Sequence, residues 1–451
     1  MLFGVIINQM PTLSISIASL EQLLAQRLGM SSGPDFWNLA ELGIYIRQAI
    51  REFQVLTGFW RQTVQLTTTA GQPYYDLHAN GAIPFTVLDT DILAQVGYHL
   101  LEYAGAGSFI NTGQFTIASV ASAFDQRREE MLGEARMVLT DLPGVSGPPP
   151  PQGRALLDNA VIQVHRAEWQ DAFTGVWNEV HRTDEMSASG WSYQWGQNPS
   201  TPTAYSMAVT RPFVIQLIPS PVNEGSLEIL ATVSQPYVMG AAQTIGIPDD
   251  SAFALPWGIL ASVLSQDAQS RDFRRAQYAA GRFRGALEVL KTWPCVMQAY
   301  PGGFSQQPVT LHALDHWQDG WRNATPALPT VVANAGRNLV ACSPVPDAAY
   351  NIALDCVANS PASGVDIAEF DCPGDIVTAI LCNANHLAAV KMGGFEFEST
   401  MEMYREFLTV AEAYTSRQRA EAIDFEALRN IATVEALSEP YEEAKAEEEA
   451  A

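Results

Sequence analysis

The sequence predicts an α+β protein in which a helical-bundle core carries small β-sheet and hairpin modules, with a unit of strands and a helical hairpin present twice. Three observations predict this class. Short runs of alternating hydrophobicity, typical of strands, are separated from longer runs whose apolar residues recur every three or four positions, as in helices. One succession of such runs, with its prolines, recurs along the chain. Hydrophobic residues make up 47 % and charged residues 16 % of the 451, which is enough apolar material for buried cores.

The N-terminal part, residues 1–142, is expected to be mostly helical. A helix is predicted over 13–28, with Ser14 or Ser16 available to cap its start. The next stretch places its apolar residues on one helical face and ends at Gly58, a residue typical of helix C-termini. The further elements expected here are strands over 60–68 and 74–77 and helices over 91–103 and 114–139.

A proline-rich segment, residues 143–153, is predicted to be an extended linker. Consecutive prolines favour polyproline II, which is fairly stiff and has no internal hydrogen bonds. A strand-rich connector, residues 154–199, is expected after it, with strands over 161–165 and 177–181 and a Trp-rich turn region.

The repeated unit is predicted over 200–292 and again over 324–416, with a Trp-rich connector, 293–323, between the copies. Each copy has a Thr-Pro pair, a Ser-Pro-Val triplet, strand-like runs and a proline followed by a helical period. The matching positions keep a nearly constant offset: Thr201-Pro202 and Thr325-Pro326, Ser220-Pro221-Val222 and Ser343-Pro344-Val345, and Pro256 and Pro373. We therefore expect an architectural protein built from duplicated modules rather than an enzyme with a single pocket.

The acidic residues concentrate at the end of the chain. The formal net charge is −24, and residues 421–451 contain ten acidic side chains against two basic ones. We expect residues 417–451 to form an acidic tail, either solvated or held by a neighbouring chain. An acidic protein repels nucleic acid and anionic membranes, and no segment has the length and apolarity of a membrane span. Five irregularly spaced cysteines predict no disulfide framework and are typical of a reducing compartment.

Little in the sequence is typical of an active site. His312 and His316 stand at helical i, i+4 spacing with Asp315 between them, a pattern that can share a metal ion. The pair lacks the glutamate of a His-Glu-x-x-His protease, so we expect a structural role, with a metal-dependent enzyme as the remote alternative. A phosphate-binding loop and a Gly-x-Ser-x-Gly elbow are both missing from the sequence. The prediction is a protein that is not an enzyme, without catalytic residues, metal ligands or cofactor.

A basic stripe is the clearest candidate for an interaction site. It consists of arginines at helical spacing on a helix whose other face is apolar: Arg271, Arg274, Arg275 and Arg282. In a strongly acidic chain, such a stripe fits an acidic surface of an identical neighbouring subunit. We therefore select these residues as subunit-interface candidates. A solvated helix face and direct DNA binding are the alternatives.

Several segments carry a family resemblance. The first contains Phe59-Trp60-Arg61 and Thr67-Thr68-Thr69-Ala70-Gly71-Gln72-Pro73-Tyr74-Tyr75-Asp76-Leu77. The others are Gly190-Trp191 through Gly196 and Pro199, Thr201-Pro202 with Tyr205, Ile215 to Pro221, and the helical pattern after Ile247-Pro248-Asp249-Asp250. Together they resemble the head-to-tail adaptor (connector) proteins of tailed bacteriophages. The match covers most of residues 13–292, and the proline-rich segment and the acidic tail have no clear counterpart.

The resemblance implies a structural protein of the virion neck that is assembled in the bacterial host cytoplasm. The expected assembly is a homo-oligomeric ring, commonly a dodecamer, that lies beneath the portal protein and joins the phage head to tail or tail-nozzle proteins. Genomic DNA would pass through its lumen without specific binding during packaging and ejection. By the same resemblance a C-terminal segment reaches the portal, which gives as portal-docking candidates Tyr441, Glu442, Glu443, Glu447, Glu448 and Glu449. A tail-completion, stopper or baseplate protein of the virion is the alternative.

Overall fold

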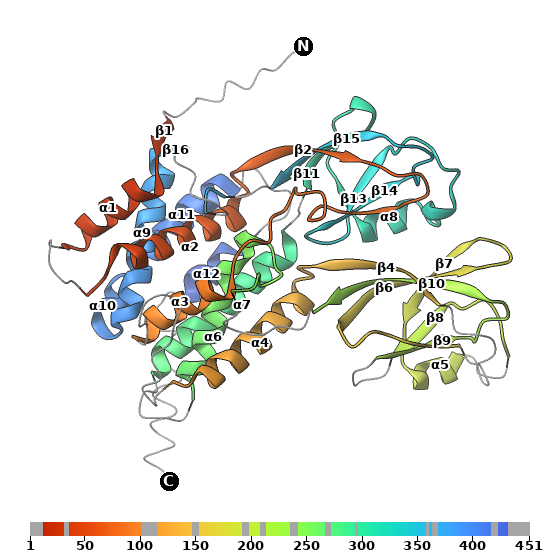
Figure 1. The fold of residues 1–451 in the computed structure, drawn as a ribbon, viewed down its shortest axis with the longest axis horizontal. Coiled ribbons are helices and arrows are strands. Elements are labelled where there is room, and N and C mark those ends of the chain that lie inside the picture. Colours follow the sequence, from red (N-terminus) through yellow and green to blue (C-terminus); the bar gives the residue numbers. More distant parts are fainter. Residues whose placement is uncertain are drawn as a thin grey trace, which may run out of the picture.

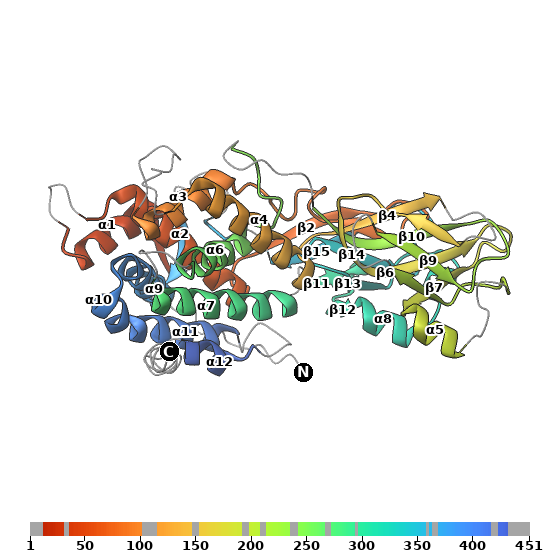
Figure 2. The same ribbon diagram turned by 90° about the horizontal axis from the view of Figure 1, so that it is seen from below.

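A helical body and two β lobes make up the protein (Figures 1 and 2), which confirms the mixed α+β class. The computed structural model describes residues 12–30, 36–101, 115–146, 153–191, 198–207, 213–234, 242–266, 272–293, 296–357, 360–362, 369–415 and 423–431. In these ranges, none of the helices combines the length and the apolar character needed to cross a membrane.

The helical body collects helices from the start, the middle and the end of the chain around one apolar core that includes Phe53, Trp257 and Phe407. Its elements are α1 (Ile17–Arg27), α2 (Leu39–Thr57), α3 (Asp89–Leu100), α4 (Ile117–Glu134), the short η1 (Asp249–Ala254), α6 (Leu255–Leu264), α7 (Phe273–Thr292), α9 (Gly374–Met392), α10 (Gly394–Ser399), α11 (Met401–Thr415) and α12 (Phe425–Ile431). A two-stranded sheet of β1 (Thr12–Ile15) and β16 (Phe370–Pro373) joins the N-terminal segment to the start of α9.

Local sequence sets the helix ends. The Ser16 hydroxyl accepts a hydrogen bond from the Ser19 amide and caps α1, as predicted. The residues just before it form β1 instead of helix because they pair with β16. Gly58, with φ of 61°, ends α2 in the left-handed conformation that glycine adopts without a Cβ clash.

The first lobe is one seven-stranded sheet in the order β4-β10-β6-β7-β8-β9-β5. Its elements are β4 (Leu139–Ser146), β5 (Arg154–Leu156), β6 (Val161–Asp171), β7 (Trp177–Arg182), α5 (Glu185–Trp191), β8 (Ala204–Met207), β9 (Val214–Ile218) and β10 (Gly225–Val233). Inward side chains such as Trp169, Ile215 and Ile229 form its own core.

The second lobe combines strands from two distant parts of the chain. It has a three-stranded sheet, β2-β15-β11, and a four-stranded sheet, β12-β13-β14-β3. Its elements are β2 (Arg61–Thr67), β3 (Tyr74–Asp76), β11 (Val296–Tyr300), η2 (Pro301–Gly303), β12 (Val309–Thr310), α8 (Leu311–Trp317), η3 (Trp321–Asn323), β13 (Val331–Asn334), β14 (Leu339–Ser343) and β15 (Asn351–Val357).

The two lobes share one strand order. The run β4-β10-β6 of the first lobe corresponds to β2-β15-β11 of the second, and β7-β8-β9-β5 corresponds to β12-β13-β14-β3. In both lobes the pair β7–β8 or β12–β13 is parallel, with a short helix, α5 or α8, between its strands. A long helix, α4 or α2, precedes each lobe, and a helical hairpin, α6–α7 or α9–α11, follows it.

The folded units cross the boundaries predicted from the sequence. Strands β2 and β3, within residues 1–142, pair with β15 and β14 of the predicted second repeat. Strand β10 of the predicted first repeat pairs with β4 and β6, which lie outside that repeat. The segment predicted as a linker begins inside β4. This strand lies at the sheet edge, and Pro143 falls where its register with β10 shifts, between Leu142 and Val145, a position that tolerates proline. Residues 147–152 lie outside the described ranges.

The lobes contact each other through a small shared core and buried ion pairs. Leu139 and Leu230 of the first lobe pack with Leu314 and Trp321 of the second. Arg166 pairs with Asp315, and Arg322 pairs with Glu228 at 2.9 Å, both across the contact.

Candidate functional site

Three arginines of the predicted basic stripe, Arg274, Arg275 and Arg282, lie on α7 and are held within the chain. Arg274 pairs with Glu398 in α10. Arg275 pairs with Asp272 at 2.6 Å and donates to the carbonyl oxygens of His99 and Val390, each at 3.2 Å. These carbonyls end α3 and α9, where a cation is favoured by unpaired helix carbonyls. Arg271 lies outside the described residues.

Arg282 is the member of the stripe that the structure contradicts. Its side chain is 3 % exposed, and its Nη2 donates to both carboxylate oxygens of Glu52 at 2.9 and 2.7 Å. A guanidinium enclosed in this way cannot contact a neighbouring subunit. Helical spacing correctly placed Arg274, Arg275 and Arg282 on one helix, but it could not show that α2 places a glutamate opposite Arg282.

The Glu52–Arg282 pair belongs to a buried polar network that joins α2, α7, α9 and α11. Glu52 also accepts from the Tyr404 hydroxyl and the Asn383 amide, each at 2.9 Å. Arg282 Nη1 donates to the Tyr278 hydroxyl at 2.7 Å, which in turn lies 2.6 Å from His386 Nε2. Burial and the nearby guanidinium hold the pKa of His386 well below its usual range, so this imidazole is neutral. The enclosed network stabilises the packing of four helices.

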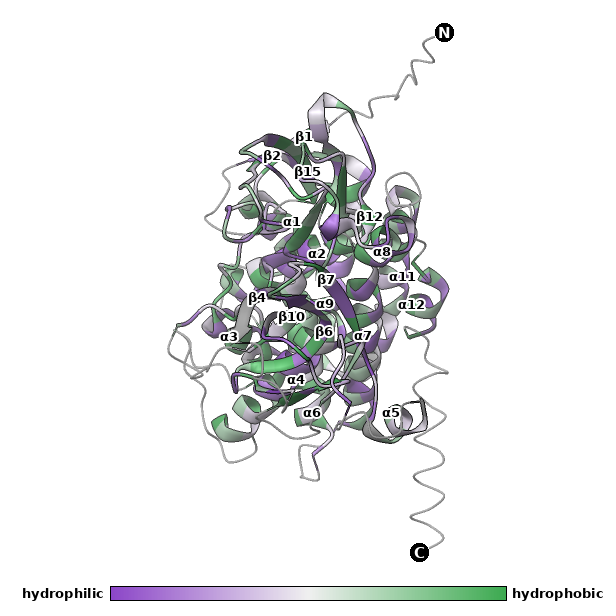
Figure 3. Ribbon diagram, turned by 90° about the vertical axis from the view of Figure 1, so that its right-hand side faces the viewer, coloured by the Kyte–Doolittle hydropathy of each residue, from purple (hydrophilic) through white to green (hydrophobic). Residues whose placement is uncertain are grey.

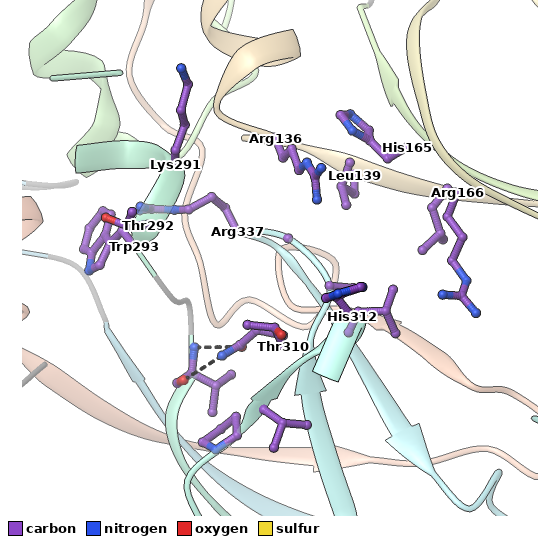
Figure 4. Close-up of a pocket in the computed structure, with 18 of the residues that line it drawn as sticks. Arg136, Leu139, His165, Arg166, Lys291, Thr292, Trp293, Thr310, His312 and Arg337 are labelled. Atoms are coloured by element: carbon purple, nitrogen blue, oxygen red, sulfur yellow. Dashed lines mark hydrogen bonds between the residues drawn. The ribbon is translucent and has the colours of Figure 1, made fainter. Parts of the chain in front are cut away.

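A cavity of about 450 Å³ lies where the two lobes meet the C-terminal end of α7 (Figure 4). We call it the interlobe cavity. It is lined by segments of β4, β6, α7, β12, α8 and the turn between β13 and β14. Its charged lining residues are Arg136, Arg166, Glu179, Lys291, Asp315 and Arg337. Four cations and two anions therefore face this space in a chain of net charge −24.

The two acidic residues of the interlobe cavity are both engaged by Arg166. It pairs with Asp315 and lies 3.5 Å from Glu179. Asp315 also accepts from the Trp321 indole at 2.9 Å. Burial raises the pKa of Glu179, and the nearby charge of Arg166 opposes this shift. Arg166 also pairs with Glu168 at 3.1 Å, so this one guanidinium is shared among three carboxylates.

The remaining cations sit in different surroundings. Arg337 is 6 % exposed, with its guanidinium 3.3 Å from the centre of the Trp293 ring. Lys291 pairs with Glu134 and Glu288 at the rim, at 3.2 and 2.7 Å. Arg136 is exposed to the cavity, and its charge adds to burial in lowering the pKa of His165 to about 4. His165 is therefore neutral at pH 7.

The His312, Asp315 and His316 group predicted as a remote metal alternative lies on α8. His312 and Asp315 line the interlobe cavity, where Asp315 already holds Arg166 and the Trp321 indole. In the part of the chain that the structure describes, no three His, Cys, Asp or Glu side chains gather as possible metal ligands.

Part of the predicted acidic tail is a helix packed on its own chain. Leu428 and Ile431 of α12 lie against Gly285 and Gly281 of α7, which have no side chain to obstruct them. The portal-docking candidates lie outside the described residues: Tyr441, Glu442, Glu443, Glu447, Glu448 and Glu449.

Comparison with known proteins adds no family. The chain matches no protein-family model, and no curated protein is significantly similar to it in sequence.

The interlobe cavity was missed by sequence reasoning, apart from His312 and Asp315. Its lining residues come from segments far apart in the chain, and only the shared lobe contact brings them together. The sequence offered no signal for it at Arg136, because the helix predicted over 114–139 placed this residue in its interior, whereas α4 ends at Glu134.

Proposed function

We propose that the chain is a structural subunit of the neck of a tailed bacteriophage. Copies would form a ring beneath the portal, join the head to the tail and pass genomic DNA through the lumen. The observation that carries the proposal is the pair of lobes with one strand order on a common helical body (Figure 1). Repeated docking modules suit a protein that binds macromolecular neighbours, whereas an enzyme needs one converging site.

We infer that the two lobes and their helices are duplicated copies of one unit. The duplicated unit is larger than the repeat seen in the sequence, because it includes the preceding long helix and the early strands. One copy, from α4 to α7, is inserted into the other between β3 and β11. The outer copy therefore has its first helix and two strands near the N-terminus and the rest near the C-terminus.

Equivalent interactions of the two long helices support this duplication. Arg51 in α2 donates to the Ala362 carbonyl at 3.1 Å, and Arg128 in α4 donates to the Ile245 carbonyl at 2.6 Å. Each acceptor lies between the last long strand of its lobe and the following helical hairpin. The packing of α2 on α9 likewise matches that of α4 on α6.

Both lobes expose large apolar side chains, which is typical of surfaces that bind other proteins. Phe173 and Met186 of the first lobe are 88 % and 87 % exposed, and Phe304 of the second is 81 % exposed. Figure 3, viewed from the lobe end, shows hydrophobic and hydrophilic residues mixed over both lobes. The lobes are therefore the surfaces we expect to contact portal or tail.

The acidic character of the chain fits a DNA passage. A channel through which DNA slides should not bind phosphates, and a net charge of −24 provides repulsion at long range.

The decisive experiment is co-sedimentation of the purified chain with isolated portal rings, followed by electron microscopy. We expect added ring-shaped density on the axial end of the portal that faces the tail. Decoration of purified tails without portal binding would favour the tail-completion, stopper or baseplate alternative. If neither portal nor tail is bound, the proposed place in the neck is wrong.

A matched pair of variants tests the role of the lobes in this binding. Phe173→Ser combined with Phe304→Ser removes two exposed apolar side chains and should lower the fraction bound by about tenfold or more. Ile117→Ser, at a half-exposed position of the helical body, is the control and should bind as the unaltered chain does. Equal binding by all three would exclude the lobes as the docking surface.

A further inference from the structure

We propose that the contact between the two lobes is a proton-dependent latch, closed while Asp141 and Glu228 share one proton and opened when that proton is lost. This device goes beyond the proposed structural role and does not depend on it, because opening of the contact can be measured on the isolated chain. The pair lies on the face of the first lobe that receives Arg322 from the second lobe.

Strand register gathers three acids on that face. Glu228 in β10 stands directly opposite Glu168 in β6. Side chains two residues apart on a strand share a face, so Glu228 lies on the same side as Leu230, which stands opposite Asp141 in β4. The three acids are therefore neighbours on adjacent strands, where like charges destabilise a sheet unless something compensates them.

One guanidinium from the second lobe spans two of these acids. Arg322 donates to Glu168 at 2.5 Å and to Glu228 at 2.9 Å, and it stacks on Trp177 with its centre 4.0 Å from the ring. Although burial favours its neutral form, Glu168 has a pKa held below the ordinary value by Arg166 and Arg322. Glu168 is thus ionised, and the positive charge of Arg322 is already shared before Asp141 is considered.

The cluster joined through the two arginines contains more acids than cations, counted over the described residues. Its cations are Arg166 and Arg322, and its acids are Asp141, Glu168, Glu179, Glu228 and Asp315. Arg166 is engaged by Glu168, Glu179 and Asp315. Asp141 therefore has no cation of its own among the described residues, and a proton is the simplest way to remove its charge.

The unpaired oxygens of the pair show where this proton is held. Asp141 Oδ1 and Glu228 Oε1 are buried without a hydrogen-bond partner among the described residues, yet the two carboxyl groups lie within hydrogen-bonding reach of each other. Two carboxylates only accept, so one of them must be protonated to donate to the other. Burial, followed by the negative charge of Glu228, raises the pKa of Asp141 to about 7, against the opposing charge of Arg322. Above pH 7 the closed contact would therefore hold two facing carboxylates.

The direction of the pH dependence follows from proton binding. When the lobes part, water reaches Asp141 and its pKa returns to about 3.9. Between about pH 4 and about pH 7 the closed form alone keeps the proton, so it loses stability relative to the open form as the pH rises. The ratio of open to closed chain should increase by roughly twentyfold from about pH 5.5 to about pH 7.5 and little further above that. Glu168, with its lowered pKa, titrates below this window.

Thiol labelling of Leu139→Cys measures this ratio. Leu139 in β4 is 2 % exposed, packs against Gly336 of the second lobe and donates its amide to Asn338 at 2.8 Å. A thiol at position 139 is therefore reached by a maleimide only when the lobes part. Rates at four pH values from about 5.5 to about 8.5 are divided by those of a cysteine peptide, which removes the change in thiolate fraction. Mass spectrometry locates the label, and Cys342, buried in the core of the second lobe, should stay equally protected throughout.

Two variants in the Leu139→Cys chain test the role of the pair. Asp141→Asn replaces the shared proton by a permanent donor of the same size, so its corrected labelling rate should stay low and constant. Asp347→Asn, at an exposed acid of the second lobe, is the matched control and should keep the twentyfold increase. The urea midpoint of Asp141→Asn at pH 7.5, expected to be at least that of the control, shows that this variant is folded.

Three results would overturn the latch. The first is a corrected rate at position 139 that is the same at all four pH values. The second is an equal increase in Asp141→Asn and Asp347→Asn. The third is labelling of Cys342 in step with position 139, because the chain would then unfold as a whole instead of opening at the lobe contact.

Discussion

At the scale of single residues, His99 is a buried imidazole that the fold keeps neutral. Its ring lies between Tyr45 and Trp257, with centroids 5.2 and 6.0 Å away. Neither ring nitrogen has a hydrogen-bond partner among the described residues. Burial, followed by the nearby charges of Arg275 and Lys391, lowers the pKa of His99 to about 3. The protonated form is therefore accessible only after unfolding.

This shift makes the free energy of unfolding depend on pH. Below pH 6.5 the unfolded chain binds a proton at His99 that the folded chain does not, so stability falls as the pH decreases from 6.5 toward 3. Replacing His99 by Phe removes this proton and the unpaired nitrogens. We expect His99→Phe to be about 1 kcal/mol more stable at pH 7 and to lose about 2 kcal/mol less between pH 6.5 and 5.

Urea unfolding at a series of pH values measures the effect. His181→Phe is the matched control, because the His181 side chain is 75 % exposed, and its pH profile should follow that of the unaltered chain. A His99→Phe profile parallel to both would mean that His99 titrates normally in the folded protein.

At the scale of elements, the buried Glu52–Arg282 network is the main polar connection among four helices. Glu52→Gln would leave Arg282 as an uncompensated buried cation, while the side chain keeps its size. We expect the free energy of unfolding to fall by about 3 kcal/mol or more. The same substitution at Glu402, in an exposed pair with Arg405 at 3.2 Å, should cost less than about 0.5 kcal/mol.

A double variant separates lost charge balance from lost packing. Combining Glu52→Gln with Arg282→Gln removes both charges, so part of the stability should return relative to Glu52→Gln alone. If the double variant is less stable than the single one, Arg282 stabilises the core through packing on Tyr404 and Trp257 more than through its charge.

Elements that depend on neighbours in the sequence were predictable, and those that depend on distant partners were not. Ser16 and Gly58 mark helix ends because capping is local, and the strands at Arg61–Thr67 and Asn351–Val357 follow from alternation. Their mutual pairing could not be foreseen, because the whole first lobe and several helices lie between them in the sequence. Similarly, Arg282 carries the periodicity of a surface residue, and only the position of Glu52 makes it part of the core.

At the scale of the whole molecule, the net charge of −24 opposes contact between copies of the chain. Arg274 and Arg275 of α7 were predicted to contact an acidic surface of a neighbouring copy. Within their own chain, Arg274 pairs with Glu398 and Arg275 pairs with Asp272. Among the described residues, the exposed apolar side chains of the lobes are then the surface that we expect to attract another copy. Salt screens exposed charges with a Debye length of about 10 Å at 0.1 M and leaves apolar contacts intact.

We therefore expect added salt to favour self-association. Between about 0.05 and about 0.5 M sodium chloride, the second virial coefficient from light scattering should fall, and sedimentation velocity should show a larger fraction of assembled chain. Arg274→Gln should leave this trend unchanged, because Arg274 is satisfied by Glu398 of its own chain. Dissociation by salt, together with weaker association of Arg274→Gln, would instead place the α7 arginines at the interface between subunits.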